Sequence, residues 1–221
     1  MILLAVETSV HACSVALHHQ GQIICDEVEA PRQQTQLLLP MIETLLARLN
    51  LGLQDVTHLA YSAGPGAFSG VRLGAAATQG LAVALNCPLV AVSSLEVLAY
   101  GIRRKYLEDR IYVVTDARMN EVYAAAFVWE HDVLHRQCED RLCKVEDLPR
   151  LDGCWFLAGN GVPFLSMPIE THGIDQNMMP SAYDVAIIAA RQIGAGCLTR
   201  PEHALPVYLR NDVWKKLPGR E

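Results

Sequence analysis

The sequence predicts a mixed α/β protein built from two lobes of the same design. Three observations support this fold class. Hydrophobic residues make up 51% of the 221 residues and charged residues 19%, a balance typical of a chain with a substantial buried core. Short apolar runs with the spacing of strands alternate with longer runs that have the spacing of helices. The order of these runs in the first half recurs in the second half, although the two halves share negligible sequence identity.

In the first half, the expected order is three strands followed by helix, strand, helix, strand and helix. The ranges are 2–8, 12–19, 22–29, 33–49, 58–62, 70–86, 88–94 and about 94–105. Short polar or glycine-bearing turns separate the first three runs, which is typical of antiparallel strands. The helix at 33–49 carries two apolar lines, and the second of them passes through Leu39 and Leu46.

The second half is expected to repeat this order in a weaker form. Strands are predicted at 110–116, 121–130, 133–143 and 154–159, and helices at 145–149 and 181–196. Three antiparallel strands that lead into alternating helices and strands, twice over, describe two ribonuclease-H-like lobes of the actin-like ATPase (ASKHA) architecture. We place residues 1–101 in the N-terminal lobe and residues 102–221 in the C-terminal lobe. Residues 204–221 have no clear place in this pattern; they can pack back against either lobe, and the first lobe is our working assignment.

Composition disfavours several classes of protein. The formal net charge of −6 disfavours unaided binding of nucleic acid, because phosphate neutralisation needs clustered Lys and Arg. No apolar run approaches the roughly 18 residues of a membrane span, and the start MILLAVETS indicates a buried strand instead of a signal peptide. We therefore expect a cytoplasmic protein that binds no membrane. Its seven cysteines, odd in number and irregular in spacing, are expected to be reduced thiols.

Two acids occupy the positions where nucleotide-binding proteins of this architecture hold phosphates and magnesium. In such proteins the first hairpin of each lobe presents an acid followed by a glycine turn, so that backbone amides can approach the phosphates. The equivalent stretches read ETS from Glu7 and DAR from Asp116, and neither has the glycine. Magnesium binding by either acid is the alternative. We interpret Glu7 and Asp116 as vestigial acids and expect no bound cofactor.

The glycine-rich stretch AYSAGPGAFSGVRLGAAATQG, residues 60–80, looks like a phosphate cradle that leads into a helix. It fails both phosphate-loop patterns. Val71 follows Gly70 where a Walker loop requires Lys, and Ser69 stands where the dinucleotide pattern requires its last glycine. An anion bound at the amino end of the helix, near Ser69 and Arg72, is the alternative interpretation. We interpret the stretch as a tight packing turn into the helix.

Hydrolase and metal signatures are weak. The sequence has no H-E-x-x-H pair and no G-x-S-x-G elbow, and no nucleophile–base pair can be assembled from it, so a peptidase is disfavoured. Four residues of zinc-ligand type, His131, His135, Cys138 and Cys143, do fall within thirteen positions. Their order matches no common zinc framework, and a β-hairpin would scatter their side chains over both faces. We therefore expect no metal site.

The helix after the glycine turn has a face of small residues. Ala76, Gly80 and Ala84 recur one turn apart and form a smooth ridge that another helix can approach closely. This helix and the one at 33–49 are both apolar on more than one side, which indicates a protein–protein surface. The residues that we assign to this partner interface are Leu39, Leu46, Arg72, Ala76, Gln79, Gly80 and Val83.

The chain resembles the bacterial TsaB family, formerly called YeaZ, in five stretches that follow one another in order. They read ILLAVETSVHACSVAL, GPGAFSGVRLGAAATQGLA, VAVSSLEVLA, DARMNEVYAAAF and PVYLRNDVWKKLPG. The resemblance extends along almost the whole chain, and the blocks GPGAFSGVR and DARMNEVY are specific. It departs from the family pattern at Glu7, where many relatives have Asp, and in the stretch 131–143.

The resemblance implies a non-catalytic subunit of the machinery that makes threonylcarbamoyladenosine in tRNA. In that family's pathway the larger, metal-binding paralogue TsaD transfers the threonylcarbamoyl group to N6 of the adenosine beside the anticodon. A TsaB chain heterodimerises with TsaD, forms a homodimer when alone and meets tRNA only through the complex, which the ATPase TsaE joins. The competing interpretation is an actin-fold ATPase or kinase with a degenerate phosphate loop, in which Glu7 and Asp116 would face each other across the cleft.

Overall fold

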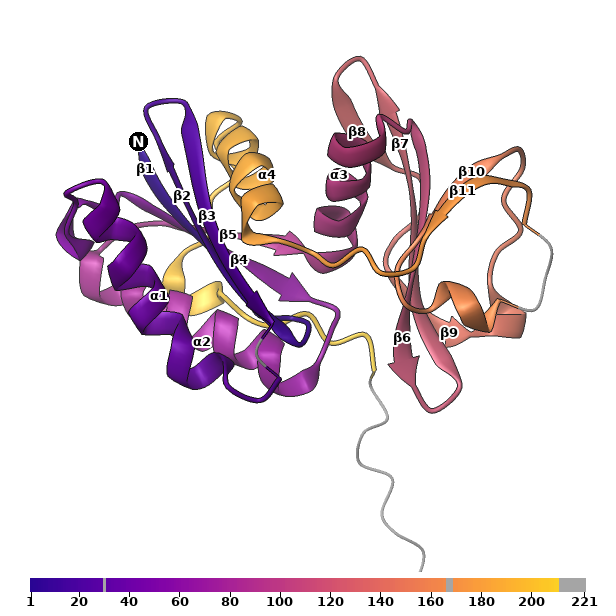
Figure 1. Cartoon of the computed structure of the whole chain (residues 1–221), viewed down its shortest axis with the longest axis horizontal. Helices are drawn as coiled ribbons and strands as arrows, with labels where there is room; N and C mark the ends of the chain where they lie inside the picture. The colour runs from indigo at the N-terminus through magenta and orange to yellow at the C-terminus, as the bar shows by residue number, and fades with distance from the viewer. Residues whose placement is uncertain (30, 166–168, 211–221) are drawn as a thin grey trace, which may run out of the picture.

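Two mixed β-sheets form the frame of the protein, one from each half of the chain (Figure 1). The structure is a computed structural model that describes residues 1–29, 31–165 and 169–210. In each sheet an antiparallel set of strands comes first in the chain, and parallel strands then extend the sheet from the first strand of that set. Each sheet is therefore ribonuclease-H-like, and the predicted actin-like ATPase architecture is confirmed.

The described α-helices begin and end within two residues of their predicted ranges, whereas the helix predicted at 145–149 is only a 3₁₀ turn. The described α-helices are α1 (Gln34–Arg48), α2 (Phe68–Leu85), α3 (Ser94–Tyr106) and α4 (Ala182–Gly194). Short 3₁₀ helices span Leu53–Asp55, Val145–Asp147, Val162–Phe164 and Pro201–His203. The cap of α3 is Ser93, whose hydroxyl accepts from the Glu96 amide at 3.4 Å.

The first sheet has the strand order β3-β2-β1-β4-β5. Its strands are β1 (Ile2–Glu7), β2 (Ala12–His19), β3 (Gln22–Glu29), β4 (His58–Gly64) and β5 (Leu89–Ser93). The central strand β1 is apolar on both faces because helices cover both sides of the sheet. Leu4 and Val6 belong to the core shared with α1 and α2, whereas Leu3 and Ala5 belong to the core shared with α4.

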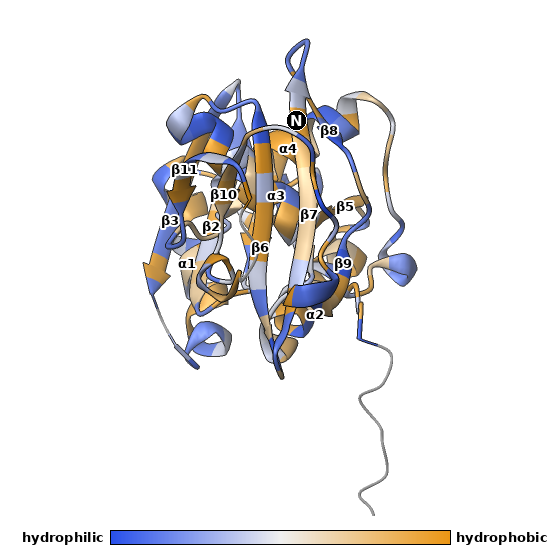
Figure 2. Ribbon diagram, turned by 90° about the vertical axis from the view of Figure 1, so that its right-hand side faces the viewer, coloured by the Kyte–Doolittle hydropathy of each residue, from blue (hydrophilic) through white to orange (hydrophobic). Residues whose placement is uncertain are grey.

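The second sheet has the order β11-β10-β6-β7-β8, and β9 also pairs with β7. Its strands are β6 (Arg110–Arg118), β7 (Glu121–Glu130), β8 (Val133–Arg136), β9 (Arg141–Lys144), β10 (Trp155–Ala158) and β11 (Thr171–Asp175). Figure 2 shows the apolar middle of β6, whose residues from Ile111 to Val114 are buried. Two strands, β8 and β9, replace the single strand predicted at 133–143, and the polar edge strand β11 was not predicted.

The last helix of each half of the chain packs on the sheet of the other half. Helix α3 comes from the first half, but its Leu95, Leu98 and Ile102 pack in the core of the second sheet. Helix α4 was expected in the C-terminal lobe; instead its apolar face, including Val185 and Ile188, packs on the first sheet, on the side opposite α1 and α2 (Figure 1). The predicted boundary between residues 101 and 102 thus falls inside α3.

The segment after α4 runs along the first lobe. Ala204 is buried in the core with α1 and α2. The Tyr61 hydroxyl donates to the Leu205 carbonyl at 3.1 Å, and the Val207 amide donates to the Ala63 carbonyl at 2.8 Å. Residues 211–221 of the predicted tail lie outside the described residues.

Candidate functional site

The glycine-rich loop is packed against the β1–β2 turn. A Cβ atom on Gly70 would lie 1.9 Å from the Thr8 carbonyl oxygen, and one on Gly66 would lie 2.5 Å from the Ser9 carbonyl oxygen. The Thr8 hydroxyl donates to the Gly70 carbonyl at 2.8 Å, and the Ala67 amide donates to the Ser9 carbonyl at 2.7 Å. These glycines therefore bring two backbones into contact, as the packing-turn interpretation requires.

A positive φ accounts for the glycine at position 64, not for the one at position 66. The φ of Gly64 is +103°, in the region that favours glycine, whereas Gly66 has an ordinary φ and is needed only for its closeness to Ser9. Gly74 continues the inner contact, since its Cβ would lie 2.7 Å from the Thr8 hydroxyl oxygen. The side of α2 that faces the β1–β2 turn is thus occupied by packing within the chain.

Glu7 is enclosed beside this contact. Its side chain is buried, and its Oε1 accepts from the Ser9 amide. Its Oε2 has no hydrogen-bond partner among the described residues. Burial raises the pKa of Glu7 from its ordinary 4.5 to about 7, since a charged carboxylate loses its water there. A buried acid of this kind does not present a charged ligand to solvent.

Asp116 is engaged within its own turn. Its Oδ1 accepts from the Arg118 amide at 2.7 Å, and its Oδ2 lies 3.0 Å from the Arg118 guanidinium. It borders a hollow of about 580 Å³ beside the β6–β7 turn whose lining does not include Glu7. Over the described part of the chain, no group of three or more His, Cys, Asp or Glu side chains is arranged to hold a metal ion.

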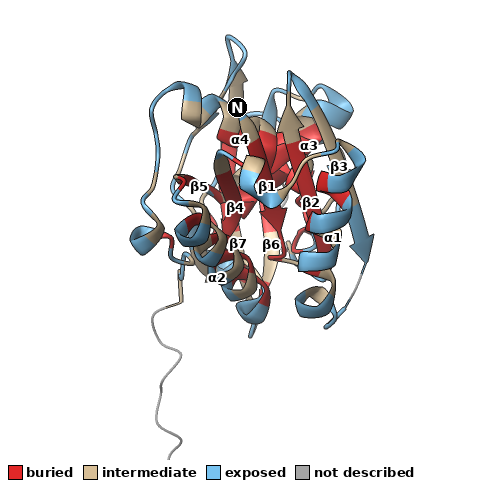
Figure 3. Cartoon of the chain, turned by 90° about the vertical axis from the view of Figure 1, so that its left-hand side faces the viewer, coloured by how far each residue is buried: buried red, intermediate tan, exposed pale blue. Residues whose placement is uncertain are grey.

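The outer face of α2 is open. Figure 3 shows exposed segments along α2 in pale blue. Ala76, Gly80 and Ala84 are exposed, and a Cβ on Gly80 would meet no described atom within 4 Å. Val83, on the same helix, is 65% exposed. On the neighbouring helix α1, Leu39 is 52% exposed. The small-residue ridge therefore faces outward.

Two of the predicted interface residues, Leu46 and Gln79, are not fully exposed. Leu46 is 3% exposed and packs in the core under α1, so it is not available to a partner, and its assignment to the interface is corrected. Its line on the helix turns inward toward Leu38 and Ile42, which a two-line pattern could not settle. Gln79 is half-buried, and its amide donates to the Pro201 carbonyl at 2.7 Å.

An aromatic pair beside Arg72 was missed. The Arg72 guanidinium lies 3.5 Å from the centroid of the Phe68 ring, and its Nε donates to the Tyr208 hydroxyl at 2.6 Å. Both aromatic side chains are about half exposed. Phe68 precedes the predicted start of the helix, and Tyr208 is 136 residues from Arg72, so local periodicity carried no signal for this cluster.

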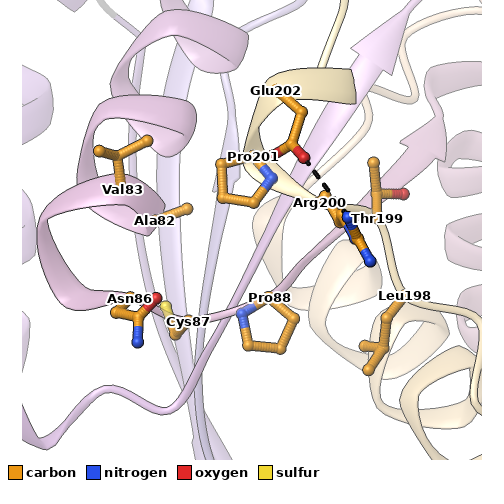
Figure 4. Close-up of a pocket in the computed structure, with 10 residues that line it drawn as sticks. All are labelled: Ala82, Val83, Asn86, Cys87, Pro88, Leu198, Thr199, Arg200, Pro201 and Glu202. Atoms are coloured by element: carbon orange, nitrogen blue, oxygen red, sulfur yellow. Dashed lines mark ion pairs between the residues drawn. The ribbon is translucent and has the colours of Figure 1, made fainter.

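A hollow of about 630 Å³ extends the face at the carboxyl end of α2. It lies between Val83 and the segment 198–202 (Figure 4), where Leu198 is also largely exposed. Arg200 and Glu202 at its edge are 4.0 Å apart, a weak surface pair. The open face thus combines a flat ridge with an adjoining recess.

Helices α3 and α4 are clamped together. Arg104 of α3 makes two hydrogen bonds to Asp184 of α4, at 2.8 and 2.9 Å, and the Asp184 side chain is fully buried. Burial raises the pKa of Asp184, and the guanidinium opposes this shift. A bidentate pair of this geometry fixes the orientation of both partners. The two sheets are therefore joined through α3 and α4.

These features define a protein of the actin-like ATPase architecture in which the glycine-rich loop is closed by packing. The family model described as TsaD, tRNA N6-adenosine threonylcarbamoyltransferase, matches residues 27–195. The chain is 37% identical to the tRNA threonylcarbamoyladenosine biosynthesis protein TsaB of Escherichia coli (strain K12), with 100% of both chains covered. It is 33% identical to the protein of the same name from Haemophilus influenzae, covering 100% of this chain and 99% of that one.

A solved structure, YeaZ from Pseudomonas aeruginosa, is similar to this fold with a TM-score of 0.90 at 36% identity, covering 94% of this chain and 99% of that one. The chain belongs to the TsaB (YeaZ) family. Across residues 1–29, 31–165 and 169–210, the structure contains no helix with the length and apolar character needed to span a bilayer.

Proposed function

We propose that this protein is a non-catalytic scaffold subunit required for threonylcarbamoyl transfer to N6 of the adenosine beside the anticodon in tRNA. The observation that carries the proposal is the contact of Gly70 with the Thr8 carbonyl, because this backbone-to-backbone packing accounts for the glycine without a bound phosphate. The enclosed Glu7 and the internally paired Asp116 support the same conclusion. Catalysis is assigned to the paralogue TsaD, with which the chain heterodimerises.

The outer face of α2 supports a helix-to-helix contact with that paralogue. Ala76, Gly80 and Ala84 leave room for close approach, because helix axes pack about 8–10 Å apart according to the side chains between them. The exposed Val83 and Leu39 add apolar area that a partner would bury. In the absence of TsaD the same face forms a homodimer.

Rigidity is what such a subunit would contribute. The clamp between Arg104 and Asp184 opposes relative movement of the two sheets, so the chain offers its partner a fixed surface. We assign no step of the threonylcarbamoyl transfer to its own side chains. The ATPase TsaE and tRNA are reached only through the complex, which acts in the cytoplasm.

Co-expression tests this proposal. The tagged chain and TsaD from the same organism should co-elute in equal amounts, and depletion of the chain in cells should lower the modified adenosine in tRNA. The chain alone, with ATP and Mg²⁺, should show no turnover above background. ATP turnover by the chain alone that disappears in Glu7→Ala or Asp116→Ala would overturn the proposal in favour of a degenerate ATPase.

A further inference from the structure

Three reactive side chains meet at the β11 edge of the second sheet, away from the outer face of α2. The Sγ of Cys154 lies 3.2 Å from Nδ1 of His172, and Nε2 of the same ring lies 2.5 Å from Oε2 of Glu108. Thiol, imidazole and carboxylate thus stand in the order nucleophile, base and orienting group. No sequence pattern indicates this pairing, because the residues come from three separate segments.

A β-bulge aims the histidine. In the parallel pairing of β10 with β11, Trp155 is opposite Thr171 but Phe156 is opposite Gly173, so His172 is the extra residue. The Thr171 hydroxyl stabilises the bulge by donating to the Gly173 carbonyl at 2.8 Å. Bulges of this kind redirect a side chain out of the regular alternation. His172 is thereby turned toward the residue that precedes β10.

We propose that Cys154 is a nucleophilic thiol, activated by His172 and oriented by Glu108, and that it is a site of oxidation by small hydroperoxides. The proposal goes beyond the scaffold function and does not depend on it. Cys154 is exposed and the His172 side chain is 40% exposed, so a small reagent can reach the sulfur.

The geometry argues against a shared metal ion. Cys154 and Glu108 contact opposite nitrogens of one imidazole ring, and one ion cannot be bound at both. It suits proton transfer instead, since Nδ1 can accept the thiol proton while Nε2–H donates to the carboxylate. Glu108 acts through the histidine and is a positioning residue.

The proposed step balances as follows. His172 takes the proton from the Cys154 thiol, and the thiolate attacks the terminal, hydrogen-bearing oxygen of the hydroperoxide. A sulfur–oxygen bond forms and the oxygen–oxygen bond breaks. The leaving hydroxide or alkoxide takes the proton from the imidazolium and departs as water or alcohol. Sulfur is oxidised by two electrons to the sulfenic acid, and the hydroperoxide is reduced by two.

Cys197 is a control inside the same chain, because it is also an exposed, free cysteine. A free thiol is only a few per cent thiolate at pH 7, so complete proton transfer can raise its reactivity by at most about 30-fold. The full-length protein is treated with hydrogen peroxide and dimedone, which traps sulfenic acid, and labelling at each cysteine is followed by peptide mass spectrometry. We expect Cys154 to be labelled at least about fivefold faster than Cys197.

The variant His172→Gln should bring the Cys154 rate down to that of Cys197, and Glu108→Gln should lower it in part. Circular dichroism confirms that each variant is folded, and alkylation by iodoacetamide gives a second rate that does not depend on oxidation. Equal rates at Cys154 and Cys197 in the native protein would overturn the proposal. So would a fast Cys154 whose rate is unchanged in folded His172→Gln.

Discussion

Replacing Glu7 with glutamine should change how stability depends on pH. In the folded protein burial raises the pKa of Glu7 to about 7, compared with the ordinary 4.5 expected when the chain is unfolded. The folded state therefore holds this proton more tightly than the unfolded state. The contribution of Glu7 to stability is fully present below pH 4.5 and is lost as the pH rises through 7.

The size of this loss follows from the two pKa values. Their difference of about 2.5 corresponds to about 3 kcal/mol, at about 1.4 kcal/mol per pKa unit. Glutamine keeps an oxygen for the Ser9 amide and removes the ionisation. Burying its new amide group costs about 1 kcal/mol. At pH 8 the variant should therefore be more stable than the native protein by about 2 kcal/mol, and at pH 4.5 slightly less stable.

Urea unfolding followed by circular dichroism, repeated between pH 4.5 and 8, measures this difference. Glu29→Gln, on the exposed end of β3, is the matched control and should stay within about 0.5 kcal/mol of the native protein at each pH. Parallel stability curves for the native protein and Glu7→Gln would show that Glu7 is not enclosed, and the account of a closed loop would be wrong.

Three further predictions concern the glycines of α2, the Arg104–Asp184 pair and the metal content of the protein. Gly70→Ala should destabilise the fold by about 1–3 kcal/mol, because its Cβ would collide with a backbone carbonyl. Gly80→Ala should instead stabilise the fold by about 0.5–1 kcal/mol through helix propensity. Equal urea midpoints for the two variants would contradict this. Arg104→Ala should lower the free energy of unfolding by about 2–3 kcal/mol, because it leaves the buried Asp184 carboxylate unpaired. Arg48→Ala, in an exposed pair, should lower it by less than about 1 kcal/mol. A larger loss for Arg48→Ala than for Arg104→Ala would show that the Arg104–Asp184 pair does not hold α3 and α4 together. Metal analysis of the purified protein should find no stoichiometric zinc, and one zinc per chain would refute our interpretation of the His/Cys stretch.

Most of the order of strands and helices could be predicted because each element carries its own period, but the polar edge strand β11 and the division of 133–143 into β8 and β9 could not. Which sheet a helix covers could not, since α3 and α4 have ordinary apolar faces that fit either lobe. Only the tertiary arrangement shows that Val185 meets the first sheet and Leu98 the second. The same limit applies to α1, where Leu39 is exposed and Leu46 is buried although both lie on one apolar line.

The candidate sites divide in the same way. The packing role of Gly66 and Gly70 followed from failed motif tests, but the contacts with Ser9 and Thr8 needed the structure. The grouping of Cys154 with its histidine and glutamate depends on a bulge between parallel strands, which is set by tertiary pairing and leaves no periodic mark in the sequence.

Gly80→Arg tests the central claim, that the outer face of α2 binds the transferase subunit. No described atom lies within 4 Å of the Cβ it would add, so the variant should fold and its α2 should gain helix propensity. In a complex the long side chain would separate the two helices at a cost of about 3 kcal/mol, which corresponds to a roughly hundredfold weaker Kd. Gly194→Arg is the matched control: this glycine is also helical, with no described atom near its Cβ, but it lies on α4, across the sheet from α2.

The decisive measurement is the Kd of each variant for purified TsaD, by titration calorimetry, with circular dichroism as the check on folding. We expect binding at least about a hundredfold weaker for Gly80→Arg and native affinity for Gly194→Arg. A folded Gly80→Arg protein that binds TsaD with native affinity would contradict it.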